Sequence, residues 1–215
     1  MLRTLALSAS VAVLALAAAQ PAKAQELDGK KLFLTKTCVA CHGRDGKKPI
    51  QTYPELAGQQ VDYLLRQMDE IASGARLSGL DARGYPRTQG MKDIMHLVAP
   101  EERKAIATWL ASLPAAPPRA PAEPVAAERL TQGKALYDAK ECTACHGPDG
   151  KEPLTDMPAL AALKRDYIVL QMTEIRDGVR KNGLTETMLP FVEKLTNDEI
   201  ALIADFLSQV DRTAK

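Results

Sequence analysis

One short cysteine pattern occurs twice in this chain, and the distance between the copies constrains the fold more than any other feature. Cys38-Val39-Ala40-Cys41-His42-Gly43 returns as Cys142-Thr143-Ala144-Cys145-His146-Gly147, 104 residues later. The two copies use all four cysteines of the chain and two of its three histidines. The chain is therefore expected to build the same site twice, in two similar settings.

Cys-x-x-Cys-His is the attachment signature of a c-type haem. Two thiols three positions apart can each form a thioether to the porphyrin, and the histidine that follows is placed to bind the iron. The sequence thus predicts two covalently bound haem c groups. The residues predicted to hold them are Cys38, Cys41, His42, Cys142, Cys145 and His146.

Three other uses of paired cysteines compete with this interpretation. A structural zinc site usually closes over a shorter span than the 104 residues that separate these pairs. A thioredoxin-like redox pair would need alternating strands and helices around it, and the sequence shows no such pattern. Structural disulfides would explain neither histidine.

The first 24 residues have the pattern of a secretory signal peptide. Arg3 supplies a positive start, an apolar run follows from Leu5 to Ala19, and Ala22-Lys23-Ala24 has the small-x-small form of a cleavage site. The apolar run is shorter than the roughly 20 residues of a membrane-spanning helix. We expect cleavage after Ala24 and, in a bacterium, a periplasmic protein, which suits haem attachment outside the cytoplasm.

A proline-rich stretch marks the middle of the chain. Its prolines lie at Pro114, Pro117, Pro118, Pro121 and Pro124. Because proline fixes φ and removes a backbone donor, residues 114–124 are predicted to be an extended, semi-stiff linker. The domains are then 25–113 and 125–215. Each is small for a self-sufficient core, and with only 4% aromatic residues a buried haem would supply much apolar volume.

The charge balance excludes a basic nucleic-acid-binding surface. Without the predicted signal peptide the net charge is −1, with +2 on residues 25–113 and −3 on residues 125–215. Nucleic-acid-binding domains instead concentrate positive charge. The unequal halves indicate a polar molecule whose two ends can prefer different partners.

The two halves are an internal repeat. At an offset of 104 the matches include Tyr63 with Tyr167, Gln67-Met68 with Gln171-Met172, and Arg76 with Arg180. The offset then falls to 97, because the first half has ten residues (81–90) where the second has three (185–187). After that point Trp109 pairs with Phe206.

Helical periodicity predicts an all-α fold, with no convincing strand. The predicted helices run from about Asp28 to Thr37, Val61 to Ser73 and Glu101 to Leu113 in the first half, and from about Ala127 to Lys140 and Asp198 to Val210 in the second. Thr196 and Glu199 have the form of a capping box. Pro100 can occupy the first position of its helix.

Each iron needs a second axial ligand, for which the candidates are methionine or His96. The mature chain has Met68, Met91, Met95, Met157, Met172 and Met188. Equivalent haems should have equivalent ligands, and only Met68/Met172 and Met91/Met188 are matched by the repeat. The first pair lies inside an amphipathic helix, where methionine usually fills the core. We therefore predict Met91 and Met188, on a loop before each closing helix, as the ligands.

Pro54 and Pro158 each lie 12 residues after the haem histidine. A backbone carbonyl beside an imidazole can accept its Nδ1–H, which orients the ring and raises its basicity. The alternative is that each proline only shapes a loop. The matched distance favours the contact with the histidine.

These features resemble a family, the dihaem class I cytochromes c of the cytochrome c4 type. The resemblance rests on the duplicated Cys-x-x-Cys-His-Gly, on residues 53–59, on Tyr63 through Gln67 with Gly74 and Arg76, and on the methionine before each closing helix. It implies two tandem cytochrome c domains packed about a pseudo-two-fold axis, His/Met ligation, and carbonyls of Pro54 and Pro158 bonded to the haem histidines.

The sequence departs from the family pattern in two places. Residues 157–162 replace the fuller motif seen at 53–59, and seven extra residues precede Met91. The long proline-rich linker also leaves open whether the domains pack closely.

Histidine and thioether on both faces would leave the iron no open position, so the expected function is electron transfer at relatively high potential, without enzymatic chemistry or a small-molecule substrate. The resemblance implies redox protein partners that dock transiently, such as a quinol-oxidising complex and a terminal oxidase or reductase. One alternative is the cytochrome subunit of a periplasmic dehydrogenase, such as a flavocytochrome sulfide dehydrogenase. Another is a dihaem peroxidase with one open iron.

Overall fold

The computed structural model describes residues 26–213, which are helical and contain no strand, only an isolated bridge between Leu80 and Pro86. This confirms the predicted all-α class. The predicted signal peptide lies outside the described residues. Within the described range, no helix is long and apolar enough to cross a membrane.

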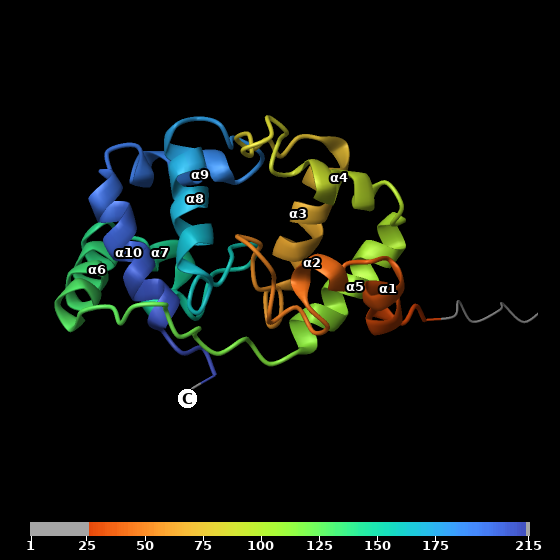
Figure 1. Cartoon of the computed structure of the whole chain (residues 1–215), viewed down its shortest axis with the longest axis horizontal. Coiled ribbons are helices and arrows are strands. Elements are labelled where there is room, and N and C mark those ends of the chain that lie inside the picture. Colours follow the sequence, from red (N-terminus) through yellow and green to blue (C-terminus); the bar gives the residue numbers. More distant parts are fainter. Residues whose placement is uncertain (1–25, 214–215) are drawn as a thin grey trace, which may run out of the picture.

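The helices form two groups in chain order, one on each side of the linker (Figure 1). The first domain contains α1 (Gly29–Thr35), α2 (Val39–His42), α3 (Val61–Ser73), α4 (Gln89–Met95) and α5 (Pro100–Ser112). The second contains α6 (Ala127–Ala139), α7 (Thr143–His146), a short 3-10 helix (Pro148–Gly150), α8 (Arg165–Arg176), α9 (Thr185–Val192) and α10 (Asn197–Gln209).

Each domain is built on its first helix crossing its last. The crossing needs a glycine, since a Cβ on Gly29 would collide with the carbonyl of Ala105, and one on Gly133 with the carbonyl of Leu202. An aromatic pair packs at each crossing: the rings of Phe33 and Trp109 lie 5.1 Å apart, and those of Tyr137 and Phe206 lie 5.9 Å apart. The two aromatic pairs occupy corresponding positions of the internal repeat, so the two crossings are equivalent.

The closing helices begin as the sequence predicts. Thr196 Oγ1 accepts the N–H of Glu199 at 3.2 Å, and Glu199 Oε2 accepts the N–H of Thr196 at 2.8 Å, which completes the capping box. Pro100 is the first residue of α5, where the missing N–H costs nothing. The middle helix α3 also has its predicted bounds.

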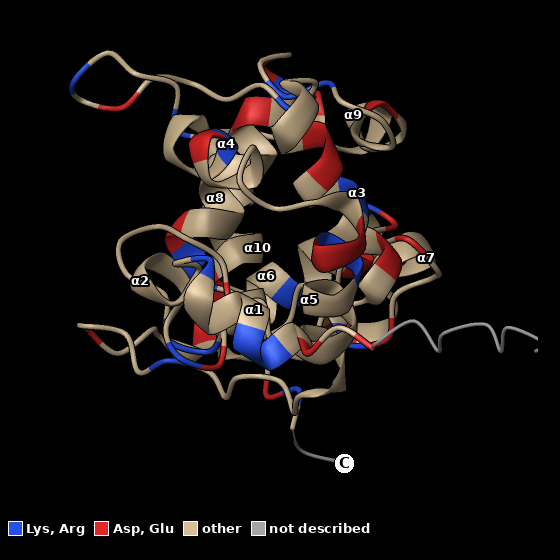
Figure 2. Cartoon of the chain, turned by 90° about the vertical axis from the view of Figure 1, so that its right-hand side faces the viewer, with Lys and Arg blue, Asp and Glu red and all other residues tan. Residues whose placement is uncertain are grey.

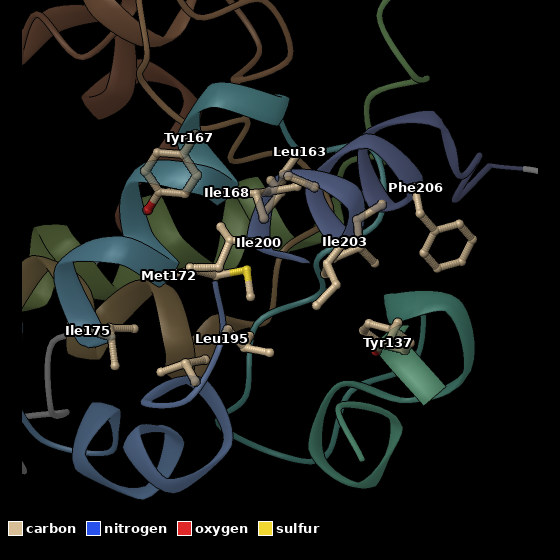
Figure 3. Packing of buried hydrophobic residues seen from close by; sticks show 13 residues of the cluster. Tyr137, Leu163, Tyr167, Ile168, Met172, Ile175, Leu195, Ile200, Ile203 and Phe206 are labelled. Carbon is tan, nitrogen blue, oxygen red and sulfur yellow. The ribbon is translucent and has the colours of Figure 1, made fainter. Parts of the chain in front are cut away.

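Each domain has its own hydrophobic core. Figure 3 shows the core of the second domain, in which Ile168, Met172 and Ile175 of α8 face Ile200 and Ile203 of α10. In the first domain the buried cluster is built from α3, α4 and α5 with Phe33 of α1. The two halves of the chain thus have separate hydrophobic cores.

The predicted loop position of the two candidate methionines is wrong. Met91 lies in the helix α4 and Met188 in the helix α9. Both helices are short, and each packs against the long middle helix of its domain. That packing supplies the stability which seven or eight residues cannot supply alone, and it is invisible to local periodicity.

The domains pack directly against each other, a point that the length of the proline-rich linker does not decide. The described residues 113–126 include no helix or strand and run along one side of the molecule (Figure 1). The segment does more than connect: Ala116 is buried, and Arg119 donates to the carbonyl of Pro49 at 3.2 Å. Hydrogen bonds between the domains hold the two units in one arrangement.

Candidate functional site

The two Cys-x-x-Cys-His segments form matching single-turn helices. In α2 the amide of Gly43 donates to the carbonyl of Val39 at 3.1 Å, and in α7 the amide of Gly147 donates to Thr143 at 3.0 Å. Both glycines have positive φ, 76° and 73°, so a side chain there would be strained. The turn ends immediately after each histidine and directs it into a pocket of its own domain.

Both histidines are held in one tautomer. The Nδ1 atom of His42 lies 3.2 Å from the carbonyl oxygen of Pro54, and Nδ1 of His146 lies 2.9 Å from that of Pro158. Because a carbonyl only accepts, Nδ1 must carry the proton, which leaves Nε2 with a free lone pair. Burial lowers the pKa of His42 to about 4 and also lowers the pKa of His146. Each ring is a neutral imidazole, the form that binds a metal.

The four cysteines are free, partly buried thiols. Burial raises the pKa of Cys38 and Cys142 to about 11, so both are protonated at neutral pH. Among residues 26–213, no group of three or more His, Cys, Asp or Glu side chains could hold a metal ion. The two cysteine pairs therefore do not converge on a shared zinc site.

The methionines near each pocket differ in burial. Met68, Met95 and Met172 are 7%, 0% and 5% exposed and belong to the hydrophobic cores. Met91 and Met188 are only partly buried, pack at the edge of those cores and line the pockets that also contain the histidines. Met68, Met95 and Met172 line the same pockets, so the predicted pair is distinguished from them by its lower burial and, as a matched pair, by lying outside the middle helices α3 and α8.

The remaining two candidates for the axial position, His96 and Met157, are placed differently from Met91 and Met188. His96 is exposed at the C-terminal end of α4 and does not line the pocket. Met157 lines the second pocket, but it occupies the place of Tyr53, which in the first domain lies against the ring of His42 with 6.0 Å between centroids. A residue at that position belongs to the histidine side of the pocket.

The pockets suit haem in both shape and chemistry. Apolar side chains make most of the walls; in the second domain they include Leu160, Leu163, Ile168, Ile175, Val192, Ile203 and Leu207. At the edge of that pocket, Arg180 Nε is buried without a hydrogen-bond partner. A macrocycle with carboxylates at one edge would fill the apolar space and give this donor an acceptor. The residues present therefore fit the group.

A polar cluster connects the two pockets, and the sequence analysis did not find its role. Gln67 Oε1 accepts from Arg76 and Arg180, both at 2.9 Å, and Gln171 Oε1 accepts from the same two guanidinium groups at 3.0 and 2.6 Å. Arg76 also donates to Tyr167 Oη at 3.2 Å. Burial and the neighbouring Arg76 charge lower the pKa of Arg180. The hydrogen-bond acceptors of both guanidinium groups are neutral side chains, while the negative charge of Glu174 acts on Arg76.

A signal for this cluster was present in the sequence. All of its members match at an offset of 104 and recur on the middle helix or just after it. Sequence reasoning used them only as marks of resemblance, because nothing local shows that two copies of one surface meet each other.

Two helical domains, each with a Cys-x-x-Cys-His turn, a carbonyl-bonded histidine and an apolar pocket, define a c-type cytochrome with two haems. The family described as Cytochrome c matches residues 27–114 and 130–211, and the chain belongs to this family. It binds two covalent haem c groups.

The relatives agree with this assignment. The chain is 34% identical to a cytochrome c4 of Pseudomonas aeruginosa over 79% of its own length and 82% of the relative. It is 30% identical to a thiosulfate dehydrogenase electron acceptor of Stutzerimonas stutzeri over 87% of its length and 88% of the relative. A reduced cytochrome c4 from Pseudomonas stutzeri superposes with a TM-score of 0.70 at 27% identity, covering 85% of this chain and 96% of that one.

Proposed function

We propose that this cytochrome c4-like electron carrier acts in the periplasm, at relatively high potential, between redox proteins of a respiratory chain. In it, His42 and Met91 bind one iron, and His146 and Met188 bind the other. The observation that supports this most directly is the equivalence of the two sites. Each pocket has a neutral histidine hydrogen-bonded to a proline carbonyl, and a partly buried methionine from the corresponding short helix, α4 or α9.

The chain contributes position and environment. When bound, haem c supplies an iron that cycles between Fe(III) and Fe(II) by one electron. Cys38, Cys41, Cys142 and Cys145 anchor the two groups covalently. The carbonyls of Pro54 and Pro158 keep each imidazole in the tautomer whose Nε2 faces the pocket. Thioether sulfur from Met91 and Met188 would raise the reduction potential of the bound iron and would leave it no open position for a substrate, so no bond chemistry is expected.

The mature protein in this proposal begins at Gln25. It consists of domains 25–113 and 125–215, with the linker 114–124 between them. Its partners are redox proteins that bind transiently, because carriers must dissociate between reactions. Along the helices, Lys and Arg positions are mixed with Asp and Glu positions (Figure 2), which favours several weak polar contacts over one strongly charged face.

A redox titration followed by haem absorbance tests the ligands. Met91→Leu is expected to abolish one high-potential haem and Met188→Leu the other, while the core variant Met95→Leu leaves both. If Met91→Leu leaves both haems at high potential and Met95→Leu removes one, the ligand of the first haem is Met95 and the repeat argument fails.

A second candidate function is that of an electron-accepting subunit bound permanently to a dehydrogenase. It is favoured by the 30% identity to a protein described as a thiosulfate dehydrogenase electron acceptor. A stable heteromer in native mass measurements of the purified protein would support this candidate over the free carrier. Binding of carbon monoxide to the reduced protein would show an open iron and contradict both.

A further inference from the structure

Side chains of each domain contact a loop of the other domain. This loop ends at the proline whose carbonyl contacts the haem histidine. We call residues 49–54 the first proximal loop and residues 153–158 the second. Both have the same internal pattern: Ile50 and Leu154 each donate a backbone N–H to the second cysteine of the motif at 2.9 Å, and each then accepts from the residue three positions later. The next proline bears the carbonyl that contacts the histidine.

Lys164 of the second domain holds the first proximal loop. Its Nζ donates to the carbonyl oxygens of Pro49 at 2.7 Å, Ile50 at 3.1 Å and Gln51 at 2.5 Å. Its backbone N–H donates to Glu55 Oε2 at 3.0 Å. Gln51 has a φ of 43°, a left-handed conformation that a non-glycine residue adopts only where its surroundings hold it.

The first domain holds the second proximal loop in the same way. Gln60, which the repeat pairs with Lys164, donates to the carbonyls of Pro153 at 3.1 Å and Leu154 at 3.2 Å. Arg66 donates at 2.6 Å to the carbonyl of Asp156, whose φ is 68°. The two clamps are therefore reciprocal.

Both clamping residues occupy the position just before a middle helix. Gln60 is the N-cap of α3 and Lys164 the N-cap of α8, and neither side chain caps its own helix. A residue such as Ser or Asp would normally be expected there. The side chains instead serve the neighbouring domain, and the two N-cap residues differ in charge: Lys164 at the first loop is a cation, whereas Gln60 at the second is neutral. Arg66, the cation at the second loop, contacts it through Asp156, with which it also forms an ion pair.

We propose that Lys164 is a positioning residue for the first haem, supplied by the second domain: it holds the first proximal loop so that Pro54 meets His42, and its charge raises the reduction potential of that haem. This inference rests on the proposed ligation by His42. Lys164 does not line either pocket, so it acts through the loop and the electric field. A nearby positive charge disfavours Fe(III) relative to Fe(II), and at a half-buried position its effect is stronger than at a free surface.

Gln60 has the corresponding place at the second haem but no charge. The sequence of this chain thus makes the two sites different at matched positions. Lys164 Nζ donates to three carbonyls of the loop that ends at Pro54, and the Pro54 carbonyl contacts His42, so the charge of this lysine is held on the histidine side of the first pocket.

Variants of the full-length, haem-loaded protein separate the two effects. Lys164→Gln removes the charge but retains a donor like that of Gln60, and Lys164→Met removes both. Lys164→Arg retains both. Gln60→Met is the reciprocal variant. Lys194→Gln is the control for charge alone, because Lys194 is an exposed lysine of the same domain for which the described structure shows no hydrogen bond or ion pair.

Two measurements are compared at both haems. Redox titration gives the midpoint potentials, and nuclear magnetic resonance of the reduced protein gives the solvent exchange rate of each histidine Nδ1–H. We expect Lys164→Gln to lower the potential of the first haem only. Lys164→Met is expected to raise exchange at His42 about fivefold, the effect of losing one ordinary hydrogen bond, and Gln60→Met to do so at His146. Lys164→Arg and Lys194→Gln should match the wild type.

The pattern across the domains decides the outcome. If Lys164→Met and Gln60→Met each change both haems equally, the residues only hold the domains together and the inference is overturned. It is also overturned if Lys164→Gln and Lys194→Gln shift the first potential alike. If instead the wild-type protein lacks a histidine-ligated first haem, the proposed function itself fails, and the two failures are distinguishable in the same spectra.

Discussion

Gln59 makes the most deeply buried hydrogen bonds between the domains, and replacing it gives a sharp test of how they are held together. Its side chain is 3% exposed, and Ala159, its partner, is also 3% exposed. Gln59 Nε2 donates to the carbonyl of Ala159 at 2.9 Å, and Gln59 Oε1 accepts the N–H of Ala159 at 2.8 Å. Gln59→Leu would leave both backbone groups without a partner.

The expected cost follows from those two groups. A buried donor or acceptor that loses its partner costs about 1–3 kcal/mol, and the leucine recovers part of this through its apolar surface, so we expect a total of about 3 kcal/mol. For a chain of 150–250 residues, about 1 kcal/mol corresponds to a fall of roughly 2–4 °C in Tm. Gln59→Leu should therefore lower the Tm by about 6–12 °C.

Thermal unfolding of the haem-loaded protein, followed by far-ultraviolet circular dichroism, measures this change. Gln132→Leu is the matched control, because Gln132 is an exposed residue of α6 that donates only to Glu128, at 3.1 Å. If Gln59→Leu lowered the Tm no more than Gln132→Leu, the domain interface would not depend on these bonds. An unchanged Tm together with separate unfolding of the two domains would lead to the same conclusion.

Three further predictions concern stability. Gly133→Ala should destabilise the protein by about 1–3 kcal/mol in denaturant titration, because the added methyl group would collide with the backbone carbonyl of Leu202. Gly90→Ala is the control and should not destabilise it, because a methyl group there would enter open space. Hydrogen bonds from the Thr196 backbone and Lys140 lower the pKa of Glu199. The stabilisation by the ionised Glu199 is therefore present above the unfolded pKa of about 4.5 and is lost as the pH falls through the folded pKa. Glu199→Gln should flatten the dependence of stability on pH in that range. Asp205→Asn weakens a buried carboxylate bound by Arg129 and Arg165 and should lower the unfolding midpoint at pH 7. A midpoint equal to that of the wild type would contradict the ionic explanation.

Local chemistry made much of this protein readable from its sequence. The spacing of Cys38, Cys41 and His42, repeated 104 residues later, identifies the cofactor because the reaction of two thiols and one imidazole with haem requires that order. The bounds of α3 and the capping box at Thr196 were likewise predicted, since both depend on residues within one or two turns. The distance of 12 residues from histidine to proline pointed to the contacts now seen at Pro54 and Pro158.

The short helices show where local reasoning ends. Met91 and Met188 were expected in loops, but α4 and α9 form because each lies against the middle helix of its domain. A helix of seven or eight residues is unstable alone, so its existence depends on contacts that sequence periodicity does not report.

By itself, the sequence determined the class of cofactor, the number of domains and the all-helical architecture, since these follow from residue spacing, helical periodicity and an internal repeat. Only the tertiary structure decided how the two domains meet. Lys164 and Gln60 occupy matched positions but are different residues, so the repeat could not identify them as partners of the opposite loop. Contacts between segments about 100 residues apart depend on the fold of both domains at once, and no local pattern encodes them.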